Sequence, residues 1–160
     1  MAEREHSKTL IYEVLPSRYG INIQHMKMVD AIELTIGQGA KPGTGGLLLG
    51  SKVSEEVAGS RDLPAGVDQR SPCRHPDFLG PDDMIIKIEE LREATDWQVP
   101  IFVKMGATRV YDDVKLAAKA GADAIVIGFA MTAFLVVLAL RSQGEQHSDH
   151  VDGQDGEQRS

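Results

Sequence analysis

The chain has 160 residues, a formal net charge of −7 and 42% hydrophobic residues, which is enough apolar material for one core. Its negative charge, with no run of Lys and Arg, argues against nucleic-acid binding. The single Cys73 excludes a disulfide framework, fits a cytoplasmic location, and cannot alone ligate an all-cysteine iron–sulfur cluster.

The first half of the chain predicts few regular elements. Residues 1–17 are mixed and include Pro16, so we expect a leading segment with little fixed structure. Residues 32–36 alternate apolar and polar side chains, which predicts a short strand. After a glycine-rich loop, Ser54 can cap a brief helix over residues 54–58. Residues 59–81 contain four prolines and are expected to be irregular.

The second half predicts a helix, a strand, a helix and a strand in that order. Asp82 or Asp83 can cap a helix whose apolar residues recur at helical spacing, and an apolar strand follows over residues 100–105. A second helix over residues 110–120 leads to a strand over residues 124–127. Short connections between alternating elements predict βαβ units, and therefore an α/β fold with a parallel sheet.

The C-terminal part begins with an uncharged run over residues 124–140, at the lower length limit of a membrane span. We favour a buried strand followed by an apolar helix over residues 128–140, because Gly128 interrupts the run. Residues 141–160 are polar and are expected to be disordered. His147 and His150 lie in this tail, where nothing preorganises a metal site.

Residues 37–46, GQGAKPGTGG, combine five glycines with Lys41. In a P-loop the lysine follows the last glycine, whereas Lys41 lies in the middle of this stretch, so a P-loop is excluded. The dinucleotide fingerprint is excluded because Pro42 occupies the position of its third glycine. The remaining interpretations are a loop that binds a carboxylate or phosphate through N–H groups and Lys41, or a tight connection with a solvated lysine.

Lys104 is the second candidate, because it lies near the carboxyl end of an apolar strand, where parallel sheets bind ligands. Its charge could stabilise negative charge on a cofactor ring, or it could simply reach water. Arg61, Arg70, Arg74 and His75 share the irregular segment and are either contacts for an acidic substrate or surface charges.

The order of these segments resembles the glutamate synthase large-subunit family, in its central FMN-binding synthase domain. The resemblance covers about residues 18–127 and rests on IELTIGQGAKPGTGG, SPCRHPDF and VPIFVKMGATRV in succession. The version GTGGLLLGSKV is most similar to stand-alone prokaryotic relatives, including the subunit associated with methylamine–glutamate N-methyltransferase.

The resemblance implies an incomplete (β/α)8 TIM-type barrel of the FMN-linked oxidoreductase kind, which reductively aminates 2-oxoglutarate to glutamate. In the family, ammonia comes from glutamine hydrolysis and electrons come through an iron–sulfur cluster, so glutaminase-type and electron-donor subunits are implied partners. Matched to the motif, Lys41 holds a substrate carboxylate, Arg61 makes a second substrate contact, Gln38 lies near flavin and substrate, and Lys104 faces the flavin ring. No residue is assigned a catalytic role.

The chain also departs from the family pattern. Thr44 replaces a usual glutamate and Leu47 a frequent glutamine, and counterparts of earlier and later barrel segments are not recognisable before residue 18 or after Ile127. We therefore expect a truncated or frameshifted fragment that binds FMN weakly or not at all. The alternative is a non-catalytic assembly module completed by partner subunits, in glutamate or N-methylglutamate metabolism.

Overall fold

The fold is built around a five-stranded sheet. The computed structural model describes residues 2–36, 46–128 and the backbone of 136–139. The strands follow the spatial order β1 (Ile11–Val14), β2 (Ala31–Thr35), β5 (Ile101–Gly106), β6 (Ala124–Gly128) and β7 (Val136–Ala139). The first four are mutually parallel, and β7 pairs antiparallel with β6. The expectation of an α/β fold with a parallel sheet is therefore confirmed.

Each parallel strand is added beside the previous one, with helical segments in the connections. These are α2 (Ile23–Met26) before β2, α4 (Asp82–Ala94) before β5 and α5 (Val110–Lys119) before β6, and the chain opens with α1 (Ala2–His6). Doubly wound sheets reverse their strand order, whereas α/β barrels do not. The sequential order is compatible with an incomplete α/β barrel, although the described strands form an open sheet.

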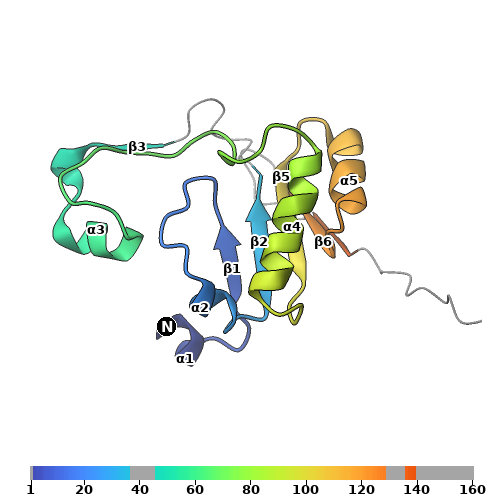
Figure 1. Cartoon of the computed structure of the whole chain (residues 1–160), viewed down its shortest axis with the longest axis horizontal. Coiled ribbons are helices and arrows are strands. Elements are labelled where there is room, and N and C mark those ends of the chain that lie inside the picture. Colours follow the sequence, from blue (N-terminus) through green and yellow to red (C-terminus); the bar gives the residue numbers. More distant parts are fainter. Residues whose placement is uncertain (1, 37–45, 129–135, 140–160) are drawn as a thin grey trace, which may run out of the picture.

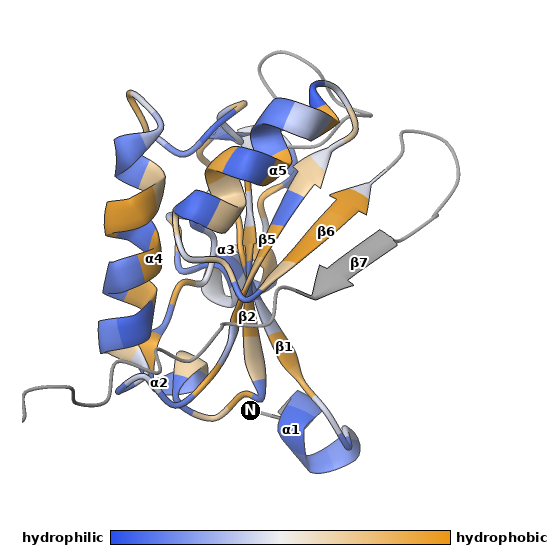
Figure 2. Cartoon of the chain, turned by 90° about the vertical axis from the view of Figure 1, so that its right-hand side faces the viewer, coloured by the Kyte–Doolittle hydropathy of each residue, from blue (hydrophilic) through white to orange (hydrophobic). Residues whose placement is uncertain are grey.

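One face of this sheet forms the core with α4 and α5. Residues Ile101, Val103 and Met105 are buried, whereas the alternate residues of β5 are only half-buried. The fully buried side chains of Ile32 and Ile125 lie in the same cluster, together with apolar residues of α4 and α5. In Figure 2, β6 is orange over most of its length, whereas α4 and α5 mix orange with blue, as expected for helices with one face toward the core.

The two long helices begin and end near the positions that the sequence predicts. The Asp83 carboxylate accepts hydrogen bonds from the backbone N–H groups of Leu79 and Gly80, so it stabilises the turn before α4. Gly121 follows α5 with a φ of +93°, a conformation that glycine adopts without a Cβ penalty.

The connection from β2 to α4 carries an extension that we call the arm, residues 46–70. It contains the two-residue strands β3 (Leu47–Leu48) and β4 (Gln69–Arg70), the short 3-10 helix η1 (Gly50–Lys52) and α3 (Glu55–Arg61). Figure 1 shows the arm extending away from the sheet, with α3 at its far end. As predicted, Ser54 caps α3 by accepting a hydrogen bond from Val57 N.

Three expectations need correction. The leading segment has fixed structure, because β1 pairs with β2 from Ile11 to Val14. Residues 59–81 are not wholly irregular, since α3 continues to Arg61 and β4 lies within them. Residues Val136–Ala139 form a strand rather than part of a helix, and this strand pairs antiparallel with β6.

Two further expectations concern the C-terminal part. Among the described residues, no helix is both long and apolar enough to cross a membrane. Residues 141–160, including His147 and His150, lie outside the described residues, so the expectation of a disordered tail stays a prediction.

Candidate functional site

A cluster of charged and polar side chains occupies the sheet face opposite the core. We call it the polar face, and it consists of Glu13, Glu33, Thr35 and Lys104. In the register of the parallel strands, Glu13 lies beside Glu33 and Thr35 lies beside Lys104. The cluster therefore joins β1, β2 and β5, and it brings together residues that are up to 91 positions apart in the sequence.

Lys104 is held between the two carboxylates. Its Nζ donates to Glu33 Oε1 at 2.8 Å and to Glu13 Oε1 at 3.3 Å. Like charges on directly opposed strand positions repel, so a cation between Glu13 and Glu33 offsets their repulsion. The Lys104 side chain remains 36% exposed, which leaves the ammonium accessible from one side.

Opposing effects act on the pKa of Lys104. Partial burial lowers the pKa, but the hydrogen bond and charge of Glu33, together with those of Glu13, outweigh burial and raise the pKa above its ordinary value. The group is therefore a permanent cation at neutral pH. A cation in this position can stabilise an anionic ligand on the polar face.

Thr35 links the polar face to the core side of the site. Its side chain is completely buried, and its Oγ1 donates to Glu13 Oε1 at 2.9 Å. Its backbone carbonyl accepts a hydrogen bond of 2.8 Å from His75 Nε2. His75 therefore carries its proton on Nε2, because a carbonyl oxygen can only accept.

His75 is an anchor rather than a surface charge. It is only 2% exposed and stacks beside Phe78 with ring centroids 5.0 Å apart. Burial lowers its pKa, and this effect exceeds the raising effect of the Thr35 carbonyl and Asp77. We infer that the SPCRHPD segment attaches the returning chain to the end of β2 through this neutral imidazole.

Asp77 reinforces the same attachment. Its Oδ2 lies 2.9 Å from Arg18 Nη2, in the loop after β1, and 2.6 Å from Lys87 Nζ in α4. Burial raises the pKa of Asp77, but the hydrogen bond from Lys87 and the positive charges lower it overall. Three segments distant in sequence are thus tied together beside the carboxyl end of the sheet.

Arg61 lies on the arm and does not meet Lys104. Its Nη1 donates to Gln69 Oε1 at 2.9 Å, and its guanidinium stacks over Tyr19, 5.0 Å from the ring centroid. Gln69 is 5% exposed, and its Nε2 has no hydrogen-bond partner within the part of the chain that the structure describes. Arg70 and Arg74 are exposed.

The other two predicted site residues, Gln38 and Lys41, lie outside the described residues, as does Thr44. Their assignments stay predictions. Ile36 and Gly46, which flank residues 37–45, both belong to the described residues. Ile36 N donates to Lys104 O at 2.8 Å, which places the start of the glycine loop directly beside β5.

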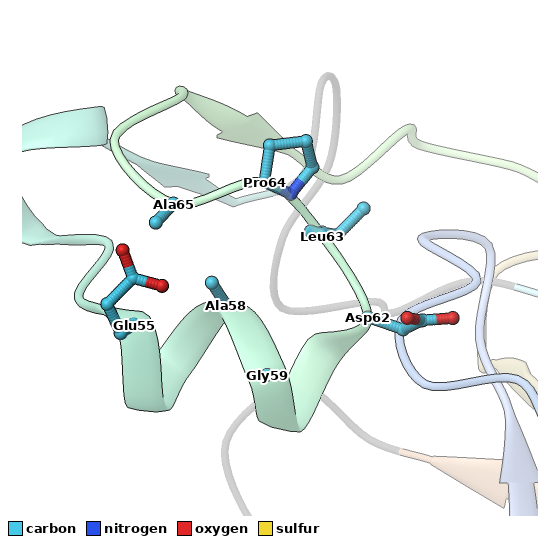
Figure 3. Close-up of a pocket in the computed structure, with 7 residues that line it drawn as sticks. All are labelled: Glu55, Ala58, Gly59, Asp62, Leu63, Pro64 and Ala65. Carbon is cyan, nitrogen blue, oxygen red and sulfur yellow. The ribbon is translucent and has the colours of Figure 1, made fainter.

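The arm also has a hollow between α3 and the following turn, lined by small and apolar residues with Glu55 and Asp62. In Figure 3 the Asp62 carboxylate points away from Ala58 and Pro64, and Glu55 lies at the other end. Two acids and no lining cation make the hollow unsuitable for a dicarboxylate. Among the described residues, no cluster of His, Cys, Asp and Glu could hold a metal ion.

Sequence reasoning found Lys104 but missed its partners. Glu33 and Thr35 occupy the polar positions of a predicted strand, so their common face could have been recognised. Glu13 could not, because β1 itself was missed. The role of His75 depends on a contact with Thr35, forty positions earlier, for which the sequence gives no local signal.

Comparisons with known proteins support a single family. The profile described as "Conserved region in glutamate synthase" matches residues 1–130. The match includes residues 18–127, over which the sequence resembles the family, and it extends to the segment that contains β1.

Similar individual proteins point to the same family as the profile. A "Glutamate synthase large subunit-like protein" of Rhizobium meliloti (strain 1021) is 62% identical over 125 residues, 78% of this chain and 28% of that protein. An "Archaeal glutamate synthase [NADPH]" of Methanocaldococcus jannaschii is 40% identical over 74% of this chain and 23% of that protein. The chain thus spans about a quarter of the length of these relatives. By its sequence and by the profile, the chain belongs to the glutamate synthase family.

Proposed function

We propose that this chain supplies part of an FMN-dependent (β/α)8 barrel that reductively aminates 2-oxoglutarate to glutamate. The observation that carries the proposal is Lys104, a cation on the polar face beside the start of the glycine loop. Relatives of this chain are named as glutamate synthases, which supports the same reaction.

On the polar face, the accessible Lys104 ammonium is the group that would contact a flavin. Reduced FMN carries negative charge on its ring, and the accessible Lys104 ammonium would lie against that charge, while Glu33 and Glu13 hold the ammonium in place. Bound FMN, once reduced, supplies the hydride that converts 2-iminoglutarate to glutamate.

The substrate would be held from the loop and the arm. We assign Lys41 and Arg61 to the carboxylates of 2-oxoglutarate, and Gln38 to a position near both substrate and flavin. Arg61 is already oriented by Gln69 and Tyr19, so its guanidinium loses little freedom on binding. Because Arg61 lies on the arm, this assignment requires the arm and the sheet to approach the same ligand.

The test uses the full chain under anaerobic conditions. FMN is reduced with dithionite, the excess dithionite is removed, and 2-oxoglutarate and ammonium are added while flavin absorbance is followed. With glutaminase-type and electron-donor subunits present, we expect reoxidation that exceeds free FMN and depends on both reactants. The chain alone, which is expected to bind FMN weakly or not at all, should show little of it. Lys104→Gln should slow reoxidation about tenfold or more, since it removes a preorganised charge.

The matched control is Lys119→Gln, which removes an exposed charge from α5. It should retain the wild-type rate. Equal rates for the wild-type chain and Lys104→Gln would contradict the proposal, as would a rate no faster than free FMN when glutaminase-type and electron-donor subunits are also present. Activity only with those subunits would favour the assembly-module form of the function, and activity of the chain alone would disfavour it.

A further inference from the structure

One carboxylate oxygen on the polar face accepts two hydrogen bonds. Glu13 Oε1 receives the Thr35 hydroxyl at 2.9 Å and the Lys104 ammonium at 3.3 Å. The three atoms come from three neighbouring strands. Because they share one acceptor, the position of the Glu13 oxygen affects the position of the ammonium.

Glu33 alone would leave the direction of the ammonium undetermined. A lysine side chain has four rotatable bonds, and a single contact allows it to pivot about its partner. The Glu13 contact supplies a second direction, but Glu13 belongs to the edge strand β1 and its side chain is 43% exposed. An exposed glutamate needs a further contact if it is to keep one rotamer.

Thr35 provides that contact from a rigid position. Its side chain has no exposed surface, and its backbone carbonyl is bound by the buried His75. A buried hydroxyl must find an acceptor, so the Thr35 Oγ1 hydrogen bond constrains Glu13. The series of contacts therefore runs from His75 through Thr35 and Glu13 to Lys104.

We propose that Thr35 and Glu13 are positioning residues that fix the direction of the Lys104 ammonium on the polar face. Their value for catalysis rests on the proposed function, whereas their effect on Lys104 does not. The residues act through Lys104, so they are separable from Glu33, which binds the same ammonium directly.

The experiment follows the Lys104 ammonium in the full chain without any flavin. The lysine ¹³Cε and ¹⁵Nζ signals are titrated with pH by NMR, and Lys104→Arg identifies the Lys104 resonance. Thr35→Val removes the hydroxyl but keeps the branched shape, whereas Thr35→Ser keeps the hydroxyl. We expect Thr35→Val to weaken proton binding at Lys104 roughly two- to threefold, and Thr35→Ser to retain the wild-type midpoint.

A double-mutant cycle separates positioning from general destabilisation. Glu13→Gln should lower the Lys104 midpoint at least as much as Thr35→Val, and the two changes together should do no more than Glu13→Gln alone. An unchanged midpoint in Thr35→Val, equal effects of valine and serine, or full additivity in the double variant would each overturn the proposal.

A second variant covers the case in which Thr35→Val does not fold. Glu13→Asp withdraws the carboxylate from both Thr35 and Lys104 at an exposed position. Because aspartate keeps the charge but loses the contact, its Lys104 midpoint should lie between those of the wild type and Glu13→Gln, and a wild-type midpoint would overturn the proposal. Because no flavin is present, these results stand apart from the anaerobic reoxidation test, so failure of one does not imply failure of the other.

Discussion

The sheet and the arm belong to one chain but are stabilised differently. The sheet places completely buried Ile32, Leu34 and Ile101 against helices, so its stability comes mainly from apolar burial. The arm buries little more than Val53, Ala58 and Gln69, and it leaves other apolar side chains such as Leu47 exposed.

Specific local contacts take the place of a core in the arm. Gly50 N donates to Asp68 Oδ1 at 2.7 Å, Gly66 N donates to Val53 O, and Asp62 ends α3 in the left-handed conformation. We therefore expect the sheet to be sensitive to cavities in its core, and the arm to be sensitive to changes at individual backbone positions such as Gly50.

The largest contrast should come from the same substitution made in each region. Leu34→Ala removes a completely buried side chain and should lower the free energy of unfolding by about 3–4 kcal/mol. Leu47→Ala changes a side chain that is 52% exposed and should cost less than about 0.5 kcal/mol. Urea denaturation measures both values. Similar losses for the two variants would remove the distinction between the regions.

Glycine positions test the arm directly. A Cβ on Gly50 would lie 2.3 Å from the backbone oxygen of Gly66, so Gly50→Ala should cost about 2–3 kcal/mol of arm stability. Hydrogen exchange should show faster exchange in residues 46–70, with the sheet protected. Gly59→Ala is the matched control, because a Cβ there meets nothing within 4 Å and alanine favours a helix. An unperturbed arm in Gly50→Ala would contradict this packing.

The junction between the two regions should respond to loss of the His75 anchor. His75→Phe removes the donor to the Thr35 carbonyl and should destabilise the chain by about 1–3 kcal/mol. His75→Gln retains an N–H donor and should cost less. Thermal unfolding compares the two variants. Equal melting temperatures for His75→Phe and His75→Gln would show that the hydrogen bond to the Thr35 carbonyl contributes no stability.

The same histidine predicts a pH dependence. Its pKa is lowered in the folded state, so the unfolded chain binds more protons below its ordinary value of 6.5. The free energy of unfolding should therefore fall as pH decreases below about 6.5. His75→Gln should lack this part of the dependence, as measured by urea denaturation between pH 7 and pH 5. A parallel decline in both proteins would assign the effect to other groups.

The smallest effect concerns the polar face. Glu33→Gln removes the closer carboxylate from Lys104, so the Lys104 pKa should fall toward or below its ordinary value. The NMR titration described above measures the shift, which should exceed that in Glu13→Gln because Glu13 lies farther from Nζ. A larger shift in Glu13→Gln would show that Glu13, and not Glu33, has the greater effect on the Lys104 pKa.

Local patterns predicted the elements of the sheet better than those of the arm. The strands around Leu34, Val103 and Ile125, and the helices before and after β5, follow from periodicity because burial repeats along them. Strand β1 was missed because a strand of only four residues close to Pro16 gives a weak signal. Its place in the sheet depends on pairing with β2, which local sequence does not encode.

The candidate site was predictable only where one residue carried its own signal. Lys104 stood out at the end of an apolar strand, but its ion pairs depend on strand register. Strands β3 and β4 have two residues each, too few for any period, and they pair across an intervening segment that contains η1 and α3. Arg61 was selected by resemblance, and its contact with Tyr19 could not be inferred from spacing.

The register of the polar face also bears on the order of folding. When the chain emerges during synthesis, β1 and β2 appear first and would place Glu13 directly beside Glu33. Their counterion, Lys104, is made 71 positions after Glu33. Mutual repulsion of the two carboxylates therefore weakens an early β1–β2 pair by up to about 1 kcal/mol until Lys104 lies between them. The third strand thus supplies the charge that the first two strands need in order to pair without repulsion.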